Sequence, residues 1–121
     1  MIFKRPDIYV SIFHKWGLPD FVDDGFEYEI WEGVAIFAHR HHEKHDCEEI
    51  HMAMDPKHRH RCRDAVKYMQ SKHKRILAIC LIGNVRIKNL LSKCGFNEIN
   101  ITERVSKSGK TEKIRVMTWD S

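Results

Sequence analysis

The sequence NVRIKNLLSKCGF, residues 84–96, contains a short helix together with its start and stop signals. Asn84 is a residue type that caps helix N-termini, and Gly95 is one that ends helices. Between them the apolar residues recur at helical spacing: Ile87, Leu90, Leu91 and Cys94. We therefore predict a helix over residues 85–94 with one apolar face turned toward a core.

The segments around this helix favour strands and a second helix. Residues 75–82 (RILAICLI) form a continuous apolar run, which is typical of a strand buried on both faces. Residues 96–105 and 112–119 flank a turn at 106–110 and predict a terminal hairpin. Upstream, the basic segment 58–73 has an apolar stripe at helical spacing. A strand–helix–strand crossover inside a run of hairpins predicts a mixed sheet and an α/β fold.

The N-terminal half predicts one helix and three strands. Residues 6–16 favour a helix that begins at a proline, with Ile8, Ile12 and Trp16 on one face. Residues 26–30 and 34–38 favour a strand hairpin, and residues 49–54 a third strand that Asp-Pro stops. The polar stretch between them, residues 39–46 (HRHHEKHD), is either a turn or an extension of the second strand.

Residues 84–96 resemble motif B of the GNAT N-acetyltransferases, whose pattern is N-x-x-A-x-x-L-Y-x-x-x-G-F. Asn84, Leu90, Gly95 and Phe96 match it in register, and Ile87 replaces the small residue. Farther upstream, Arg59 aligns with the first position of the family's R-x-x-G-x-G/A loop in motif A. The resemblance covers residues 48–105, about half of the chain.

The resemblance implies a single GNAT-like domain over residues 1–121. Its central sheet would be mixed and mostly antiparallel, with helices on its faces. The motif A region would cover residues 48–75, the motif B region 76–96 and the C-terminal hairpin 97–119.

The resemblance also implies an activity, which is acetyl-CoA-dependent transfer to a primary amine of a protein or of a small cationic acceptor. In the family, backbone N–H groups at a helix start bind the pyrophosphate of coenzyme A, and a Glu on the preceding strand often serves as base. The candidate catalytic residues here, which the sequence does not separate, are Glu48, Glu49 and His51. The candidate cofactor-binding residues are Met52, Met54, Arg59, His60, Arg61, Cys62, Arg63, Asn84 and Leu91.

The chain departs from the family pattern in three places. Cys62 and Asp64 replace the two loop glycines, Leu91 replaces the motif B tyrosine, and the first strand is reduced to residues 1–3 at most. The side chains at 62 and 64 oppose a close approach of the backbone to a phosphate, which the neighbouring arginines compensate by charge. Short, glycine-poor chains of this kind are similar to proteins encoded by tailed bacteriophages. The alternative function is therefore a catalytically inactive GNAT-fold phage protein that binds a host protein or belongs to a virion.

The charge distribution suits an anionic ligand at one place and a cationic ligand at another; the alternative is that both charged stretches are solvated surface. Residues 56–75 hold eight Lys or Arg and a single acid, whereas residues 16–38 hold six acids and no Lys or Arg. The basic stretch would contact phosphate, and four of the acids are candidates for holding a cationic amine: Asp23, Asp24, Glu27 and Glu29. Nucleic acid ranks last among the partners, because the basic segment lacks the interleaved aromatics of single-strand binders. The sequence leaves a monomer and a homodimer both open.

Neither a metal nor a membrane is expected. The His-rich stretch places His39 and His41 on one strand face, and His58 and Cys62 on one helix face, but no spacing matches a closed zinc site. The longest apolar run is far shorter than the roughly 20 residues of a membrane helix. The four cysteines form no C-x-x-C pair, and the start has no secretory apolar region, so we expect reduced thiols in a cytoplasm.

Overall fold

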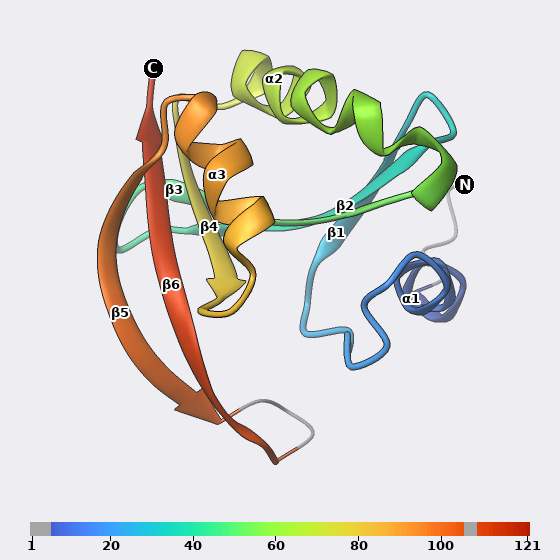
Figure 1. Cartoon of the computed structure of the whole chain (residues 1–121), viewed down its shortest axis with the longest axis horizontal. Helices are drawn as coiled ribbons and strands as arrows, with labels where there is room; N and C mark the ends of the chain where they lie inside the picture. The colour runs from blue at the N-terminus through green and yellow to red at the C-terminus, as the bar shows by residue number, and fades with distance from the viewer. Residues whose placement is uncertain (1–5, 106–108) are drawn as a thin grey trace.

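Six strands form one mixed sheet in the order β1-β2-β3-β4-β6-β5 (Figure 1). The computed structural model describes residues 6–105 and 109–121. The strands are β1 (Glu27–Trp31), β2 (Ala35–His42), β3 (Cys47–Met54), β4 (Arg75–Leu81), β5 (Asn97–Val105) and β6 (Thr111–Asp120). All neighbours are antiparallel except β3 and β4, which are parallel. The predicted α/β architecture with a mostly antiparallel sheet is confirmed.

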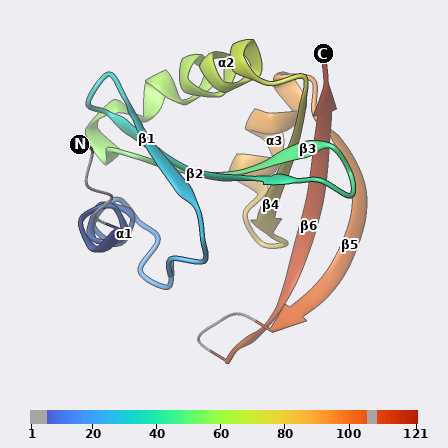
Figure 2. The same cartoon turned by 180° about the vertical axis from the view of Figure 1, so that it is seen from behind.

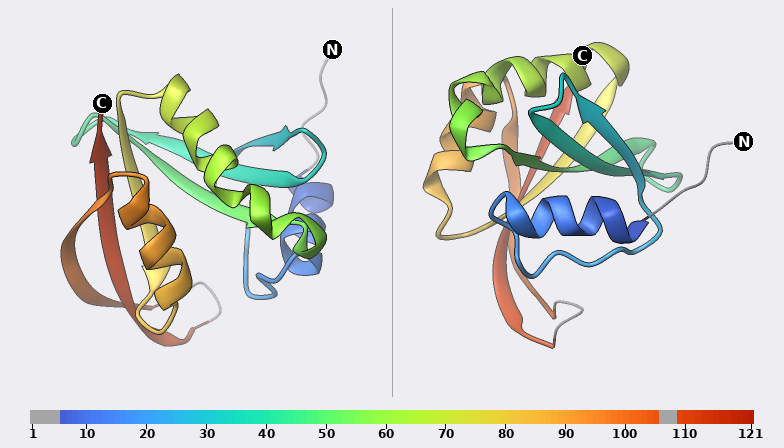
Figure 3. Two further views of the ribbon diagram at one scale, coloured as in Figure 1. Left: turned by 45° about the horizontal axis from the view of Figure 1, so that its top comes forward. Right: turned by 90° about the vertical axis from the view of Figure 1, so that its right-hand side faces the viewer.

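Helices cover both faces of the sheet (Figures 1 and 3). They are α1 (Pro6–Lys15), the 3-10 helix η1 (Pro56–Arg61), α2 (Cys62–Lys72) and α3 (Val85–Lys93). We call the side covered by α2 and α3 the α2 face, and the other side the α1 face. The core of the α2 face includes Phe37, Met69 and Met117, whereas Phe13 and Ile36 lie in a smaller core under α1. No helix in the described ranges is long and apolar enough to cross a membrane.

Most predicted elements are present, and the differences have local causes. The helix predicted over 58–73 begins with a 3-10 segment, because Asp55 caps the amide of Lys57 at 3.0 Å and His58 leaves the helical region with φ −123°. Residues 39–42 extend β2, since they pair with residues 47–50 of β3. In α1 the buried residue is Phe13, from the apolar row beside the predicted one; Ile12 and Trp16 pack against the same core, whereas Ile8 is 47% exposed.

Two predicted features fall outside the described residues. They are the strand remnant at residues 1–3 and the tip of the terminal hairpin at 106–108. The two strands of that hairpin, β5 and β6, are present and paired. All four cysteines are free thiols, as predicted.

The feature that matters most for function is the short pairing between β3 and β4. It joins Glu48–Ile50 to Ile76–Ala78 and then stops. Beyond it β3 pairs only with β2, and β4 only with β6, so the two facing edges have no strand partner among residues 6–105 and 109–121. Figures 2 and 3 show β3 running on toward η1 while β4 turns away toward α3. Free strand edges of this kind accept an extended ligand through backbone hydrogen bonds.

Candidate functional site

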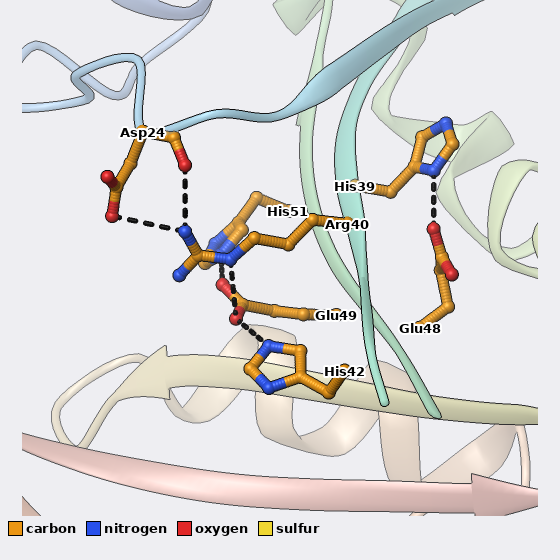
Figure 4. Close-up of polar contacts among 7 residues, drawn as sticks. All are labelled: Asp24, His39, Arg40, His42, Glu48, Glu49 and His51. Atoms are coloured by element: carbon orange, nitrogen blue, oxygen red, sulfur yellow. Dashed lines mark hydrogen bonds and ion pairs between the residues drawn. The ribbon is translucent and has the colours of Figure 1, made fainter. Parts of the chain in front are cut away.

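The two adjacent carboxylates of β3 point to opposite faces of the sheet (Figure 4). Successive side chains of a strand alternate between its faces, so Glu48 and Glu49 cannot serve the same site. Glu49 lies on the α1 face beside Arg40, His42 and His51. Glu48 lies on the α2 face beside His39. The structure therefore separates candidates that the sequence left together.

Glu49 is buried and held by three donors. Its side chain accepts from His51 Nε2 at 2.5 Å, from His42 Nε2 at 2.6 Å and from Arg40 Nε at 3.2 Å. Burial alone would raise the pKa of this carboxyl, but His51, His42 and Arg40 outweigh burial and lower it to about 2. Glu49 is therefore a fixed anion that orients its neighbours, with no oxygen suited to taking a proton near neutral pH.

His51 lies one residue beyond the last β3–β4 pair, at the point where the two strands part. Its ring is packed edge-on against Phe26 and Phe21, with centroid separations of 5.2 and 6.4 Å. When Nε2 carries the proton that is donated to Glu49, Nδ1 of the neutral ring is free to accept one. A carboxylate-oriented imidazole of this kind has the chemistry of a general base.

Arg40 and His42 belong to this cluster, and the sequence analysis did not single them out. Arg40 stands directly across from Glu49 in the β2–β3 register. It also donates to Asp24 Oδ2 at 3.1 Å and so ties the loop before β1 to the cluster. In a strand over residues 39–42, alternate side chains face the same side of the sheet, which would place residues 40 and 42 together. This signal could be used only once residues 39–42 were known to form a strand.

Glu48 is held on the other face by two histidines of β2. Its Oε1 lies 2.7 Å from His39 Nδ1, and its Oε2 lies 3.3 Å from His41 Nδ1. The side chains of Glu48 and His39 are only 12% and 13% exposed. Glu48 is thus engaged away from the α1 face, where Glu49 and His51 lie.

The predicted phosphate-binding residues lie at the start of α2, but they do not act as one group. Arg59, His60 and Arg63 are exposed there. Arg61 is already engaged, because it donates to Glu32 at 2.6 Å and lies over the ring of Trp31 at 4.6 Å. Its guanidinium therefore points toward the β1–β2 turn.

The other predicted cofactor-binding residues are largely part of the core. Met54 and Leu91 are 5% and 7% exposed and belong to the core of the α2 face, and Met52 and Cys62 pack against it. Asn84 caps α3, accepting from the amide of Ile87 at 3.2 Å. It also lines an open depression of about 570 Å³ with Leu81, Ile82, Gly83, Glu112 and Lys113.

A basic residue that the sequence analysis missed lies at the start of α3. Burial raises the pKa of the Cys62 thiol, while the charges of Arg86 and Arg59 act in the opposite direction. The positive charges of Arg86, in the first turn of α3, and of Arg59, in η1, therefore both act on the surroundings of Cys62. The signal in the sequence was the position of Arg86, two residues after the helix cap.

The acids proposed to hold an amine are divided between different partners. Asp24 pairs with Arg40, and Asp23 accepts from the hydroxyl of Tyr28 at 2.5 Å. Glu29 pairs with Lys72 at 2.5 Å and also accepts from Tyr68. These acids therefore do not converge on one cation site.

Comparison with known proteins identifies the fold. No family model and no curated protein sequence matches the chain. Among solved structures, a chimera of the spermidine N-acetyltransferase SpeG from Vibrio cholerae and hSSAT is 14% identical with TM-score 0.62, over 72% of this chain and 59% of that one. The ribosomal-protein-S18-alanine N-acetyltransferase from Escherichia coli is 18% identical with TM-score 0.60, over 80% and 71%. A putative acetyltransferase from Salmonella typhimurium with its cofactor acetyl-CoA is 14% identical with TM-score 0.56, over 72% and 57%.

These likenesses establish the architecture of the chain. The chain has the fold of these N-acetyltransferases, with its six-stranded sheet in the order β1-β2-β3-β4-β6-β5. The match spans only 59% of the length of the spermidine acetyltransferase chimera and 57% of that of the Salmonella protein.

Proposed function

We propose that this chain, which has the GNAT fold, is an acetyl-CoA-dependent N-acetyltransferase that acts on a primary amine. The observation that carries the proposal is the parting of β3 and β4 after Ile50 and Ala78. It leaves two strand edges without a strand partner among the described residues, and a polar side chain capable of base chemistry, His51, stands where they separate. A catalytically inactive protein of the same fold would not need a base such as His51 at this point.

The residues around the parting strands fit acetyl-CoA. The free edge of β3 over residues 51–54 suits the amide-containing pantetheine arm. Arg59, in η1 just before α2, and Arg86, in the first turn of α3, supply positive charge for the phosphates. The replacement of a glycine by Cys62 suggested a side chain that would block the start of α2. In the structure Cys62 packs against the core, so its side chain does not cover that position. Acetyl-CoA, when bound, supplies an acetyl group already activated as a thioester.

We assign the acceptor side to the α1 face, where His51 and Glu49 lie. His51 Nδ1 takes a proton from the bound ammonium, which leaves a neutral amine able to attack the acetyl carbon. Glu49 orients the imidazole and stabilises it once it is charged, and Arg40 and His42 hold Glu49 in place. With Leu91 at the family's tyrosine position, solvent supplies the proton for the departing thiolate.

The first test is the melting temperature with excess acetyl-CoA, with ATP as the control for bare phosphate affinity. Ligand at about 100 times its Kd stabilises by about 2.7 kcal/mol, a rise of several degrees for this size. Arg59→Ala and Arg86→Ala should reduce the shift, whereas Lys93→Ala, on the last turn of α3, should leave it unchanged. No shift with acetyl-CoA, or an equal shift with ATP, contradicts the proposal.

The second test separates an enzyme from a silent binding protein. Release of free coenzyme A is followed with a polyamine, such as spermidine, and with short peptides that have a free N-terminus. His51→Gln should lower kcat by about 100-fold or more, with the acetyl-CoA thermal shift retained and His45→Gln as the control. The silent alternative is supported by Asp64 at one of the two glycine positions and by Leu91 at the tyrosine position. It predicts no thioester cleavage with any amine and co-purification of a defined protein partner.

A further inference from the structure

Three side chains that are distant in sequence meet on the α2 face, at the end of the sheet where β3 and β4 are still paired. They are His39 of β2, Glu48 of β3 and His73, the residue that follows α2. Each offers one ligand atom, and these atoms lie within 4.8 Å of one another. The rings of His39 and His73 are 5.9 Å apart between centroids. None of the three lies on the α1 face, where we place His51 and Glu49.

His73 has a ring nitrogen whose hydrogen-bonding capacity the described residues do not use. Its Nε2 is buried and has no hydrogen-bond partner in the described part of the chain. A buried polar atom without a partner costs about 1–3 kcal/mol, so such an atom needs an explanation.

We propose that His39, Glu48 and His73 bind a Zn²⁺ ion. Two imidazoles and one carboxylate form a common protein ligand set for zinc, with water completing the tetrahedron. Magnesium and calcium are disfavoured, because both prefer oxygen ligands. The ion would replace the proton that joins His39 Nδ1 and Glu48 Oε1 at 2.7 Å, and that proton would leave to solvent. This proposal does not rest on acetyl transfer.

The position of the site shows which elements a bound ion would join. Glu48 stands opposite Ile76, within the three residue pairs that join β3 to β4. An ion held by His39, Glu48 and His73 would tie β2 and β3 to the α2–β4 connection. Glu48 would then be a metal ligand and could not also act as the catalytic base. The base of the proposed acetyl transfer would therefore come from the α1 face. The sequence predicted no metal site because the spacing of these three residues follows no known motif.

The test is zinc titration calorimetry on tag-free, chelator-treated full-length protein, with thermal melts and Co²⁺ spectra alongside. The wild-type chain should bind one Zn²⁺, melt at a higher temperature with zinc than with Mg²⁺, and give the visible spectrum of tetrahedral Co²⁺. His39→Gln, Glu48→Gln and His73→Gln should each weaken zinc binding by about 100-fold or more. His58→Gln, which changes a histidine outside the cluster, should bind zinc like the wild type.

Two results would overturn the proposal. One is a wild-type chain that binds zinc no tighter than the cluster variants or gives only the octahedral Co²⁺ spectrum. The other is a loss on His58→Gln as large as that on Glu48→Gln, which would mark adventitious binding by the His-rich surface. If His73→Gln fails to fold, the wild-type Co²⁺ spectrum and Glu48→Gln, which keeps the size of the side chain, still decide the matter. The acetyl-CoA thermal shift of the zinc-free protein reports separately on the proposed enzyme.

Discussion

At the scale of single residues, Glu49 shows how one buried charge organises its surroundings. It is 3% exposed, and the side chains of Arg40, His42 and His51 all converge on it. A buried anion is tolerated only when its oxygens are matched by donors, and the donors depend on the anion in the same way. The α1-face cluster is therefore a structural unit as well as a candidate site.

We predict that Glu49→Gln lowers the free energy of unfolding by about 2 kcal/mol, because its three donors lose a charged acceptor while Arg40 keeps its pair with Asp24. Urea unfolding followed by circular dichroism measures the change. Glu27→Gln, an exposed glutamate on β1, is the matched control and should be close to neutral. Equal effects of the two substitutions would show that the cluster contributes little to stability.

At the scale of elements, the end of α3 depends on a glycine. Gly95 follows the helix with φ +91°, a conformation that L side chains rarely adopt. An added Cβ would also lie 3.4 Å from the Trp119 ring on β6. Gly95 thus ends the helix and allows the following segment to enter β5 beside β6.

We expect Gly95→Ala to lower the free energy of unfolding by about 1–2 kcal/mol, mainly through the left-handed backbone that the new side chain must adopt. Gly83→Ala is the matched control, since no heavy atom lies within 4 Å of its added Cβ and its φ is not positive. Melting temperatures of the three proteins measure the difference. A Gly83→Ala variant that loses as much as Gly95→Ala would contradict this explanation.

Elements with local signals were predictable, whereas the sequence named part of the candidate site, including Glu49 and His51, without showing how its residues are arranged. The helix after Asn84 carries its cap, its apolar stripe and its terminating glycine in one short stretch, so it could be placed from sequence. The base candidates could not be separated, because adjacent residues of β3 belong to opposite faces and only the sheet shows which face is which. Arg86 and His73 were missed for a related reason, since each acquires its role from elements distant in sequence.

At the scale of the whole molecule, the sheet consists of two parts joined by a short parallel seam. The strands β1, β2 and β3 form one part, and β4, β6 and β5 the other. The seam holds three residue pairs, whereas β4 and β6 pair over seven. The proposed acetyl-CoA site lies between the parts, so a bound ligand would contact both.

We therefore predict that acetyl-CoA slows amide hydrogen exchange in residues 51–54 of β3 and 79–81 of β4 together. Both edges lack a strand partner without ligand, and a bound arm would supply one. Exchange followed by mass spectrometry makes the comparison, with β5, at the far edge of the sheet, as the internal control. Protection of only one edge, or of β5 to the same degree, would contradict a ligand placed between the two parts.

The short seam also determines how the molecule bears force. The N-terminal helix packs on β2 and β3, whereas the C-terminus ends β6, so tension applied to the two ends of the chain pulls the parts in different directions. Only three residue pairs of β3 and β4 oppose that load directly, together with one core in which side chains of α2 and α3 are packed with Phe37, Met54 and Met117. Under traction the chain would yield first between β3 and β4, with each part still internally paired.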